Sequence, residues 1–221
     1  MATFAFIHGA GDVGWYWHLV ETELRIAGHD TVAPDLPVED DAAGLAEYAT
    51  TVVDAIDDRR DVVVVAQSFG GYVAPIAAER IGARLIVLVA GMIPSPGESA
   101  EEMFTTTRWA PEQLEDRSER AVFYHDVPDA LASEALSRGR RQSDTPGREP
   151  WPLRAWPEIR TSFILGRNDR FFPPDWLRPV VQERLGIEPA EIDTGHCPAL
   201  SRPTELAGLL DRYAMESTQG A

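Results

Sequence analysis

The stretch Val62-Val63-Val64-Val65-Ala66-Gln67-Ser68-Phe69-Gly70-Gly71 decides the fold of this 221-residue chain. Four consecutive valines are typical of a strand buried on both faces. The two glycines permit a tight turn, and the alanine-rich segment 72–80 predicts a helix after it. A serine at such a corner is lifted out of the core, as in a nucleophile elbow with the pattern G-x-S-x-G. Ala66 replaces the first glycine here, and the alternative is an ordinary tight turn after a buried strand.

Strand and helix patterns alternate on both sides of this corner. Apolar, β-prone segments predict strands at 3–8, 30–33, 62–67, 85–90, 161–166 and 190–193. Helical patterns lie between or after them, at 15–27, 42–57, 72–80, 174–185 and 204–213. This alternation predicts an α/β fold with a doubly wound, mostly parallel sheet and helices on both of its faces.

The alternation stops between residues 93 and 157, where prolines are frequent and no long apolar strand pattern occurs. A structureless loop of this length is uncommon inside a compact domain. Short helices are expected at 100–107, 111–117 and 129–137. We therefore expect residues 1–92 and 158–221 to form the core of the fold, with a small helical cap, residues 93–157, inserted into it.

Composition excludes several kinds of partner. The net charge of −16 argues against binding to nucleic acid or to anionic lipid, which both require positive surface. All 20 basic residues are arginine, so no lysine is present for Schiff-base chemistry, and the single cysteine, Cys197, cannot form an intrachain disulfide. No signal-peptide pattern and no apolar run of about 20 residues is found. We expect a soluble, cytoplasmic protein without membrane attachment, and monomer and homodimer both remain open.

Ser68 requires a base to become a nucleophile, and histidine has the suitable pKa. Among five histidines, His196 lies on a loop between a predicted strand and the last helix, where open α/β sheets place their sites. Asp169 follows another predicted strand and would orient the imidazole. The chain order Ser68, Asp169, His196 is the order found in α/β-hydrolases. Asp193 is a rival acid, but it lies too close to His196 in sequence to oppose it easily.

Acyl transfer also requires donors for the developing oxyanion. The backbone N–H of Phe69, directly after the nucleophile, is one candidate. The second is the N–H of Ala10, in the loop after the first predicted strand, where Gly9 and Gly11 let the backbone approach closely. The imidazole of His8 is expected to brace this loop and not to contact substrate.

Several motifs carry a family resemblance, namely Phe6-Ile7-His8-Gly9-Ala10-Gly11 with Trp15-Tyr16-Trp17, Ala27-Gly28-His29, Pro34-Asp35-Leu36-Pro37, Gln67-Ser68-Phe69-Gly70-Gly71, and Gly195-His196-Cys197-Pro198 with Ser201-Arg202-Pro203. Along nearly its whole length the chain resembles the α/β-hydrolase superfamily. Within it, the chain is most similar to the small plant-type esterase and hydroxynitrile-lyase group and its bacterial relatives. The resemblance implies Ser68 as nucleophile, His196 as base and Asp169 as its partner, and it supports Ala10 and Phe69 as the oxyanion hole.

The resembled group contains two chemistries. Its hydroxynitrile lyases have threonine at the position of Gly9 and a lysine after the catalytic histidine, where Cys197 stands here. The resemblance therefore favours ester hydrolysis, and a lone cysteine at that position is expected to serve packing.

The cap is expected to close over Ser68 with an apolar substrate pocket. The candidate pocket residues are Gly9, Phe104, Phe123, Tyr124, His125, Trp151, Phe171 and Cys197. The large aromatic residues of the cap could instead form its own small core. His125 and Asp126 could meet a polar substrate group or lie at a solvated turn.

These observations favour a carboxylesterase-like serine hydrolase that acts on a small carboxylic ester and requires neither a metal nor an organic cofactor. Two alternatives remain open at this point. One is a lyase that uses Ser68 and His196 for acid–base chemistry, and the other is a non-catalytic receptor for a small molecule on the same fold.

Overall fold

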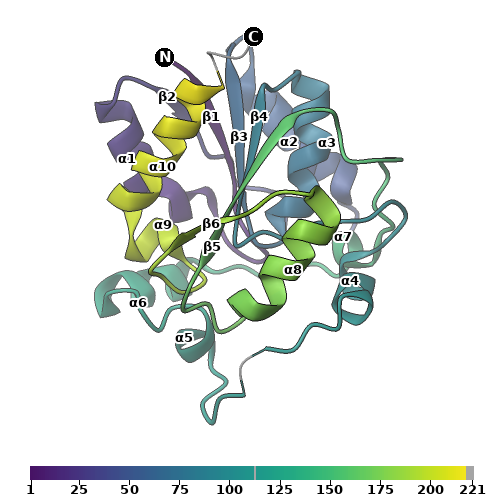
Figure 1. Ribbon diagram of the computed structural model, residues 1–221, viewed down its shortest axis with the longest axis vertical. Helices are drawn as coiled ribbons and strands as arrows, with labels where there is room; N and C mark the ends of the chain where they lie inside the picture. Colours follow the sequence, from purple (N-terminus) through teal and green to yellow (C-terminus); the bar gives the residue numbers. More distant parts are fainter. Residues whose placement is uncertain (112, 218–221) are drawn as a thin grey trace.

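A six-stranded parallel sheet forms the centre of the computed structural model, which describes residues 1–111 and 113–217. Its strands are β1 (Thr3–Ile7), β2 (Asp30–Val32), β3 (Val62–Gln67), β4 (Leu85–Val89), β5 (Arg160–Gly166) and β6 (Ala190–Ile192). They are ordered β2-β1-β3-β4-β5-β6, and all neighbouring pairs are parallel (Figure 1). The predicted doubly wound fold is confirmed, with a sheet that is parallel throughout.

The valine run occupies the middle of this sheet and is buried on both faces. Val63 and Val65 belong to one hydrophobic cluster, whereas Val62 and Val64 belong to the other. Successive side chains of a strand point to opposite faces, so a strand covered on both sides needs apolar residues at every position. All six residues of β3 are accordingly buried.

Helices cover both faces of the sheet (Figure 1). On one face lie η1 (Gly14–Trp17), α1 (His18–Ile26), α9 (Pro198–Ser201) and α10 (Pro203–Glu216), and on the other lie α2 (Leu45–Ile56), α3 (Gly70–Ile81) and α8 (Pro174–Leu185). The pair α1 and α10 packs together, as does the pair α2 and α3. Within residues 1–111 and 113–217, no helix is both long and apolar enough to cross a membrane.

The segment between β4 and β5 contains short helices and, in its described residues, no strand. They are α4 (Ala100–Thr106), α5 (Glu119–Val122), α6 (Asp129–Arg138) and α7 (Thr145–Arg148). The expected helix at 111–117 is wrong, because the described residues of that stretch form none. Leu114 is the one large apolar residue among them, so a helix there would have no apolar face to bury. The helix begins later, after Ser118, whose hydroxyl accepts the N–H of Ala121.

The parallel arrangement brings distant parts of the sequence to one edge of the sheet. The loops that follow β1, β3, β5 and β6 all leave from the carboxyl ends of their strands. Ligand sites of open α/β sheets lie at this edge.

Candidate active site

Ser68 stands at a strained corner between β3 and α3. Its backbone φ is +52°, a left-handed conformation that non-glycine residues rarely adopt. The Ser68 carbonyl accepts hydrogen bonds from the N–H of Gly71 at 3.0 Å and of Met92 at 2.9 Å, which fix the corner. A Cβ on Gly71 would lie 2.0 Å from the carbonyl oxygen of Met92, so glycine is required there. The serine is thereby presented at the end of the strand and is partly exposed.

His196 and Asp169 are in direct contact. His196 Nδ1 lies 2.8 Å from Asp169 Oδ2, and each residue is 3% exposed. The other carboxylate oxygen, Oδ1, accepts the backbone N–H groups of Phe171 at 2.9 Å and Phe172 at 2.8 Å. Three hydrogen bonds therefore fix the carboxylate, and Nδ1 of the imidazole donates to it when the carboxylate is ionised.

Aromatic rings surround the imidazole of His196. The rings of Phe123, Phe171 and Phe172 have their centroids 5.2–5.3 Å from that of His196. These contacts limit the orientations that the imidazole can adopt and exclude water from its faces.

Asp193, the rival acid, is not the partner of His196. Its side chain is exposed, and its Oδ1 accepts a hydrogen bond from Asn168 Nδ2 at 2.7 Å. It joins the loop after β6 to the loop after β5. A Cβ on Gly166, at the end of β5, would lie 2.4 Å from the carbonyl oxygen of Thr194, so the two loops are in close contact.

His125 and Asp126 hold these loops from the α5–α6 side. Asp126 Oδ2 accepts the N–H of Gly195 at 2.7 Å and the hydroxyl of Thr194 at 3.1 Å. His125 Nε2 lies 3.0 Å from the carbonyl oxygen of Asn168. His125 lines a separate hollow and not the cavity that contains Ser68. A histidine at a turn gives no sequence signal of the main-chain group that it will contact.

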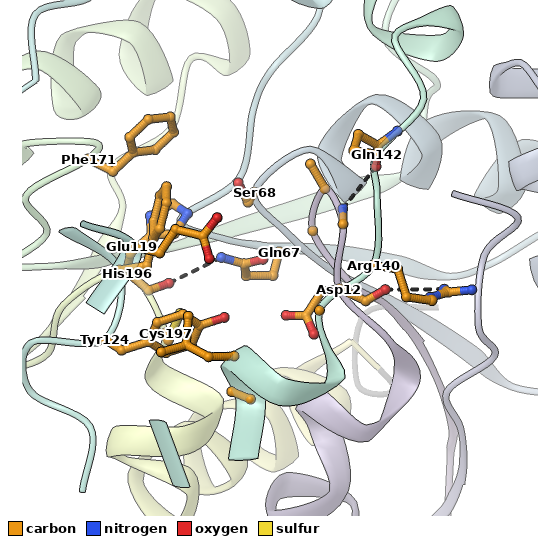
Figure 2. A pocket seen from close by; sticks show the side chains of 17 residues that line it. Asp12, Gln67, Ser68, Glu119, Tyr124, Arg140, Gln142, Phe171, His196 and Cys197 are labelled. Carbon is orange, nitrogen blue, oxygen red and sulfur yellow. Dashed lines mark hydrogen bonds between the residues drawn. The ribbon is translucent and has the colours of Figure 1, made fainter. Parts of the chain in front are cut away.

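Ser68 and His196 line one cavity of about 480 Å³ (Figure 2). Its wall comprises Gly9, Ala10, Gly11, Asp12, Gln67, Ser68, Glu119, Phe123, Tyr124, Ala135, Leu136, Gly139, Arg140, Gln142, Phe171, His196 and Cys197. Within the described residues, neither Ser68 Oγ nor His196 Nε2 has a hydrogen-bond partner. The hydrogen bond between a nucleophile and its base is often long in an enzyme without substrate and shortens when the substrate binds.

Two further expected pocket residues lie elsewhere. Trp151 is 2% exposed, and its indole N–H donates to the carbonyl oxygen of Tyr72 at 3.1 Å, so it belongs to the core beside α3. Phe104 packs against Trp109, with ring centroids 4.7 Å apart, and also contacts Phe171, behind the cavity wall. Both side chains therefore pack against the core on one face of the sheet, and they form no separate core within the described part of the inserted segment.

The loop after β1 lies directly beside the nucleophile. A Cβ on Gly9 would lie 2.4 Å from Gln67 Oε1 and 3.2 Å from Ser68 Cβ. In the described part of the chain, the backbone N–H groups of Ala10 and Phe69 have no hydrogen-bond acceptor. Two main-chain donors next to Ser68 are therefore available to a bound molecule.

His8 braces this loop, as the sequence predicted. Its imidazole is fully buried, with Nδ1 2.8 Å from the Gly9 carbonyl oxygen and Nε2 accepting the N–H of Leu36 at 3.0 Å. Burial lowers the pKa of His8 to about 4, with the Gly9 hydrogen bond acting in the opposite direction. At neutral pH the imidazole is uncharged, with its proton on Nδ1.

Several residues of the cavity were missed from the sequence. The amide of Gln67 donates to the carbonyl oxygen of His196 at 3.2 Å and so joins the elbow to the histidine loop. Asp12 directly follows the Gly9–Gly11 loop, and this position at a strand end was a usable signal. Burial raises the pKa of Asp12 to about 6.

Burial also raises the pKa of the Cys197 thiol, which therefore stays protonated. No cluster of three or more metal-binding side chains occurs in the described residues.

Known proteins resemble this chain along nearly its whole length. Methyl jasmonate esterase 1 from Vitis vinifera is 30% identical and covers 94% of this chain and 94% of its own. Norfluorocurarine synthase 1 from Strychnos sp is 22% identical over 96% of this chain and 94% of its own. Alpha-hydroxynitrile lyase from Arabidopsis thaliana is 23% identical over 96% and 97%, respectively.

A solved structure shares the fold. An extracellular alpha/beta-hydrolase from a Paenibacillus species superposes with a TM-score of 0.80 at 21% identity, covering 96% of this chain and 98% of its own. A family model described as the alpha/beta hydrolase family matches residues 4–209. The resemblance to plant esterases, to the lyase group and to bacterial hydrolases is thereby confirmed, and the carboxylesterase-like activity agrees with the named relatives. The chain belongs to the alpha/beta hydrolase family.

Proposed function

We propose that this chain is a serine hydrolase that cleaves a small carboxylic ester through an acyl-enzyme. Ser68 is the nucleophile, His196 the general base and Asp169 the group that orients the imidazole. The observation that carries this proposal is the 2.8 Å contact between His196 Nδ1 and Asp169 Oδ2, made by an imidazole that lines the same cavity as the serine at the strained corner.

The reaction proceeds in two halves. His196 Nε2 takes the proton of Ser68 Oγ while Oγ forms a bond to the carbonyl carbon of the ester. The bond from that carbon to the alcohol oxygen then breaks, and the departing alkoxide receives the proton from His196. Water repeats the sequence, with its proton passing to His196 and then to Ser68, and the acid is released. Asp169 stabilises the imidazolium in both halves.

The N–H groups of Ala10 and Phe69 would hold the oxyanion of each tetrahedral intermediate. Both donors are without an acceptor in the described residues, so binding the oxyanion does not require another hydrogen bond to break. Loss of one such donor typically lowers turnover by about 10²–10³-fold.

Residues 93–157 are proposed to act as a cap over this site. Glu119, Phe123, Tyr124, Arg140 and Gln142 come from this segment and line the cavity together with residues of the sheet domain. A cap that supplies aromatic side chains excludes water and accommodates an apolar acyl or alcohol group.

The lyase alternative has one observation in its favour, the similarity to an alpha-hydroxynitrile lyase. Two features oppose it. First, the Cβ of a threonine in place of Gly9 would lie 2.4 Å from Gln67 Oε1. Second, the chain contains no lysine, so none follows His196. Ester hydrolysis is therefore the function that the site supports best.

The proposal is tested by hydrolysis of p-nitrophenyl acetate. Ser68→Ala and His196→Ala should reduce activity to background while both variants stay folded, whereas the matched surface variant Ser137→Ala should keep full activity. Unchanged turnover by Ser68→Ala in a clean preparation would refute the proposal. Release of an aldehyde from a cyanohydrin by a protein inactive on esters would favour the lyase, and saturable binding of esters without turnover would favour a receptor.

A further inference from the structure

The mechanism proposed above leaves a carboxylate in the cavity unused. Asp12 Oδ1 accepts the backbone N–H of Val13 at 2.8 Å. Asp12 Oδ2 has no hydrogen-bond or ion-pair partner among the described residues. Figure 2 shows this carboxylate directed into the cavity, where the hydroxyl of Tyr124 points toward it. A substrate held at Ser68 therefore shares a cavity with an acceptor that the protein itself leaves open.

The charges around the cavity favour a cation. Among the lining residues, Asp12 and Glu119 carry carboxylates and Arg140 carries the guanidinium. Arg140 Nη2 donates to the main-chain carbonyl oxygens of Asp12 at 3.2 Å and Leu36 at 2.9 Å. Its guanidinium lies on the side of Asp12 that is away from His196 (Figure 2). Arg140 thus supports the backbone of this loop and forms no ion pair with the Asp12 carboxylate in the described structure.

The groups next to Asp12 compensate its charge only in part. Burial, before any other cause, raises the pKa of Asp12, while the hydrogen bond from Val13 and the charge of Arg140 act in the opposite direction and the charge of Asp35 adds to the increase. The Tyr16 hydroxyl is fully buried and has no hydrogen-bond partner in the described structure. Burial raises the pKa of Tyr16 and of Tyr124, and the charge of Asp12 contributes to both increases. The Asp12 carboxylate is desolvated, and its Oδ2 has no ion-pair partner in the described structure, so a positively charged ligand group would restore part of the lost stabilisation.

Aromatic side chains complete the surroundings. The rings of Phe123, Tyr124 and Phe171 line the same cavity. Such rings attract cations, and alkylated ammonium groups are bound well between an acidic residue and aromatic faces. The net charge of −16 adds a weaker, long-range attraction for cations.

We propose that Asp12 makes this cavity selective for esters whose acyl or alcohol part carries a positively charged nitrogen. The proposal rests on the ester hydrolysis proposed above. Asp12 acts as a specificity-determining residue through its charge, with Tyr124 and the neighbouring aromatic rings enclosing the cationic group.

The test compares esters that differ in charge but not in shape. Acetylcholine and 3,3-dimethylbutyl acetate form one pair, with the charge on the alcohol side. The p-nitrophenyl esters of 4-(trimethylammonio)butanoic acid and of 5,5-dimethylhexanoic acid form the other, with the charge on the acyl side. The readout is the ratio of kcat/KM for the charged ester to that for its neutral isostere, so a general loss of activity cancels.

In the wild-type protein, the ratio should exceed about tenfold in at least one pair, because a partly buried ion pair is worth more than the roughly 1.4 kcal/mol that a tenfold change represents. Asp12→Asn, which keeps an acceptor for Val13, should bring that ratio close to unity. The matched control Asp54→Asn removes the same charge from an exposed position of α2 and should keep the preference.

Ratios within about threefold in both pairs of the wild-type protein, or a preference that survives Asp12→Asn, would overturn this inference. Those outcomes require turnover of the neutral esters that depends on Ser68, so they leave the proposed hydrolysis intact. Absence of Ser68-dependent turnover for all four esters would instead refute the proposed function, and the inference with it.

Discussion

Replacing Asp169 with asparagine separates the two roles of its carboxylate, which are to accept backbone N–H groups and to orient the imidazole of His196. Oδ1 accepts the N–H groups of Phe171 and Phe172, and Oδ2 accepts the proton on His196 Nδ1. Asparagine offers one oxygen and one NH₂ group. The N–H groups of Phe171 and Phe172 both need an acceptor, so the amide oxygen must take the place of Oδ1. The NH₂ group then takes the place of Oδ2 and faces His196 Nδ1.

The consequence is a change of tautomer. An NH₂ group facing Nδ1 forces that nitrogen to accept, so the imidazole proton moves to Nε2 and the base can no longer take the proton of Ser68. In the opposite orientation of the amide, the NH₂ group would face the buried N–H groups of Phe171 and Phe172. Each of these two donors would then lack an acceptor, at a cost in free energy of roughly 1–3 kcal/mol. A penalty of about 4 kcal/mol limits the productive orientation to about one molecule in 10³. With the loss of the negative charge beside the imidazolium, we expect kcat to fall by about 10³–10⁴-fold.

The assay measures kcat and KM with p-nitrophenyl acetate, together with thermal unfolding. Asp169→Asn should lose activity while its free energy of unfolding changes by no more than about 1 kcal/mol, because both backbone hydrogen bonds are kept. Asp193→Asn is the matched control, since Asp193 is exposed and contacts Asn168 rather than His196. Retention of more than about a tenth of the wild-type kcat by Asp169→Asn, or an equal loss in Asp193→Asn, would refute this reasoning.

Three further changes test other parts of the site. Gly9→Ala places a Cβ 2.4 Å from Gln67 Oε1, so we expect at least about a tenfold loss of kcat/KM and a destabilisation of about 1–3 kcal/mol, measured by ester hydrolysis and urea unfolding. Asp126→Ala leaves the N–H of Gly195 without its acceptor and should lower both kcat and the melting temperature, whereas an unchanged kcat would show that the loop needs no such support. Burial raises the pKa of Asp12 from 3.8 to about 6, so the folded state binds this proton more tightly than the unfolded state and wild-type stability falls as pH rises through that window. Asp12→Asn should therefore be more stable to urea than wild type at pH 7.5, by about 3 kcal/mol, and by less than about 1 kcal/mol at pH 4, and an equal difference at both pH values would contradict the assignment.

The sheet and the contact between Asp169 and His196 follow from local sequence patterns. The valine run predicts a central strand because only a strand covered on both faces is apolar at every position. Parallel strands end at one edge, so three side chains that each follow a strand can be expected to lie close together. The expected contact between Asp169 and His196 is present in the structure.

The inserted segment is harder to predict for a physical reason. Its helices are short, so packing against the rest of the molecule decides which way each aromatic residue points. Trp151 is directed into the core by a hydrogen bond to Tyr72, and His125 is directed to the main chain of Asn168. No periodicity marks either contact. Asp12 could have been found, because it follows a glycine-rich loop at a strand end, but its pKa depends on surroundings that sequence alone does not reveal.

The central claim, a covalent intermediate on Ser68, is tested most directly by mass spectrometry. The protein is mixed with p-nitrophenyl acetate, quenched in acid within the first turnovers and digested. The account predicts one acetyl group on the peptide that contains Ser68, and none on that peptide in Ser68→Ala. Steady release of p-nitrophenol without this adduct, or with the acetyl group on Cys197 instead, would contradict it.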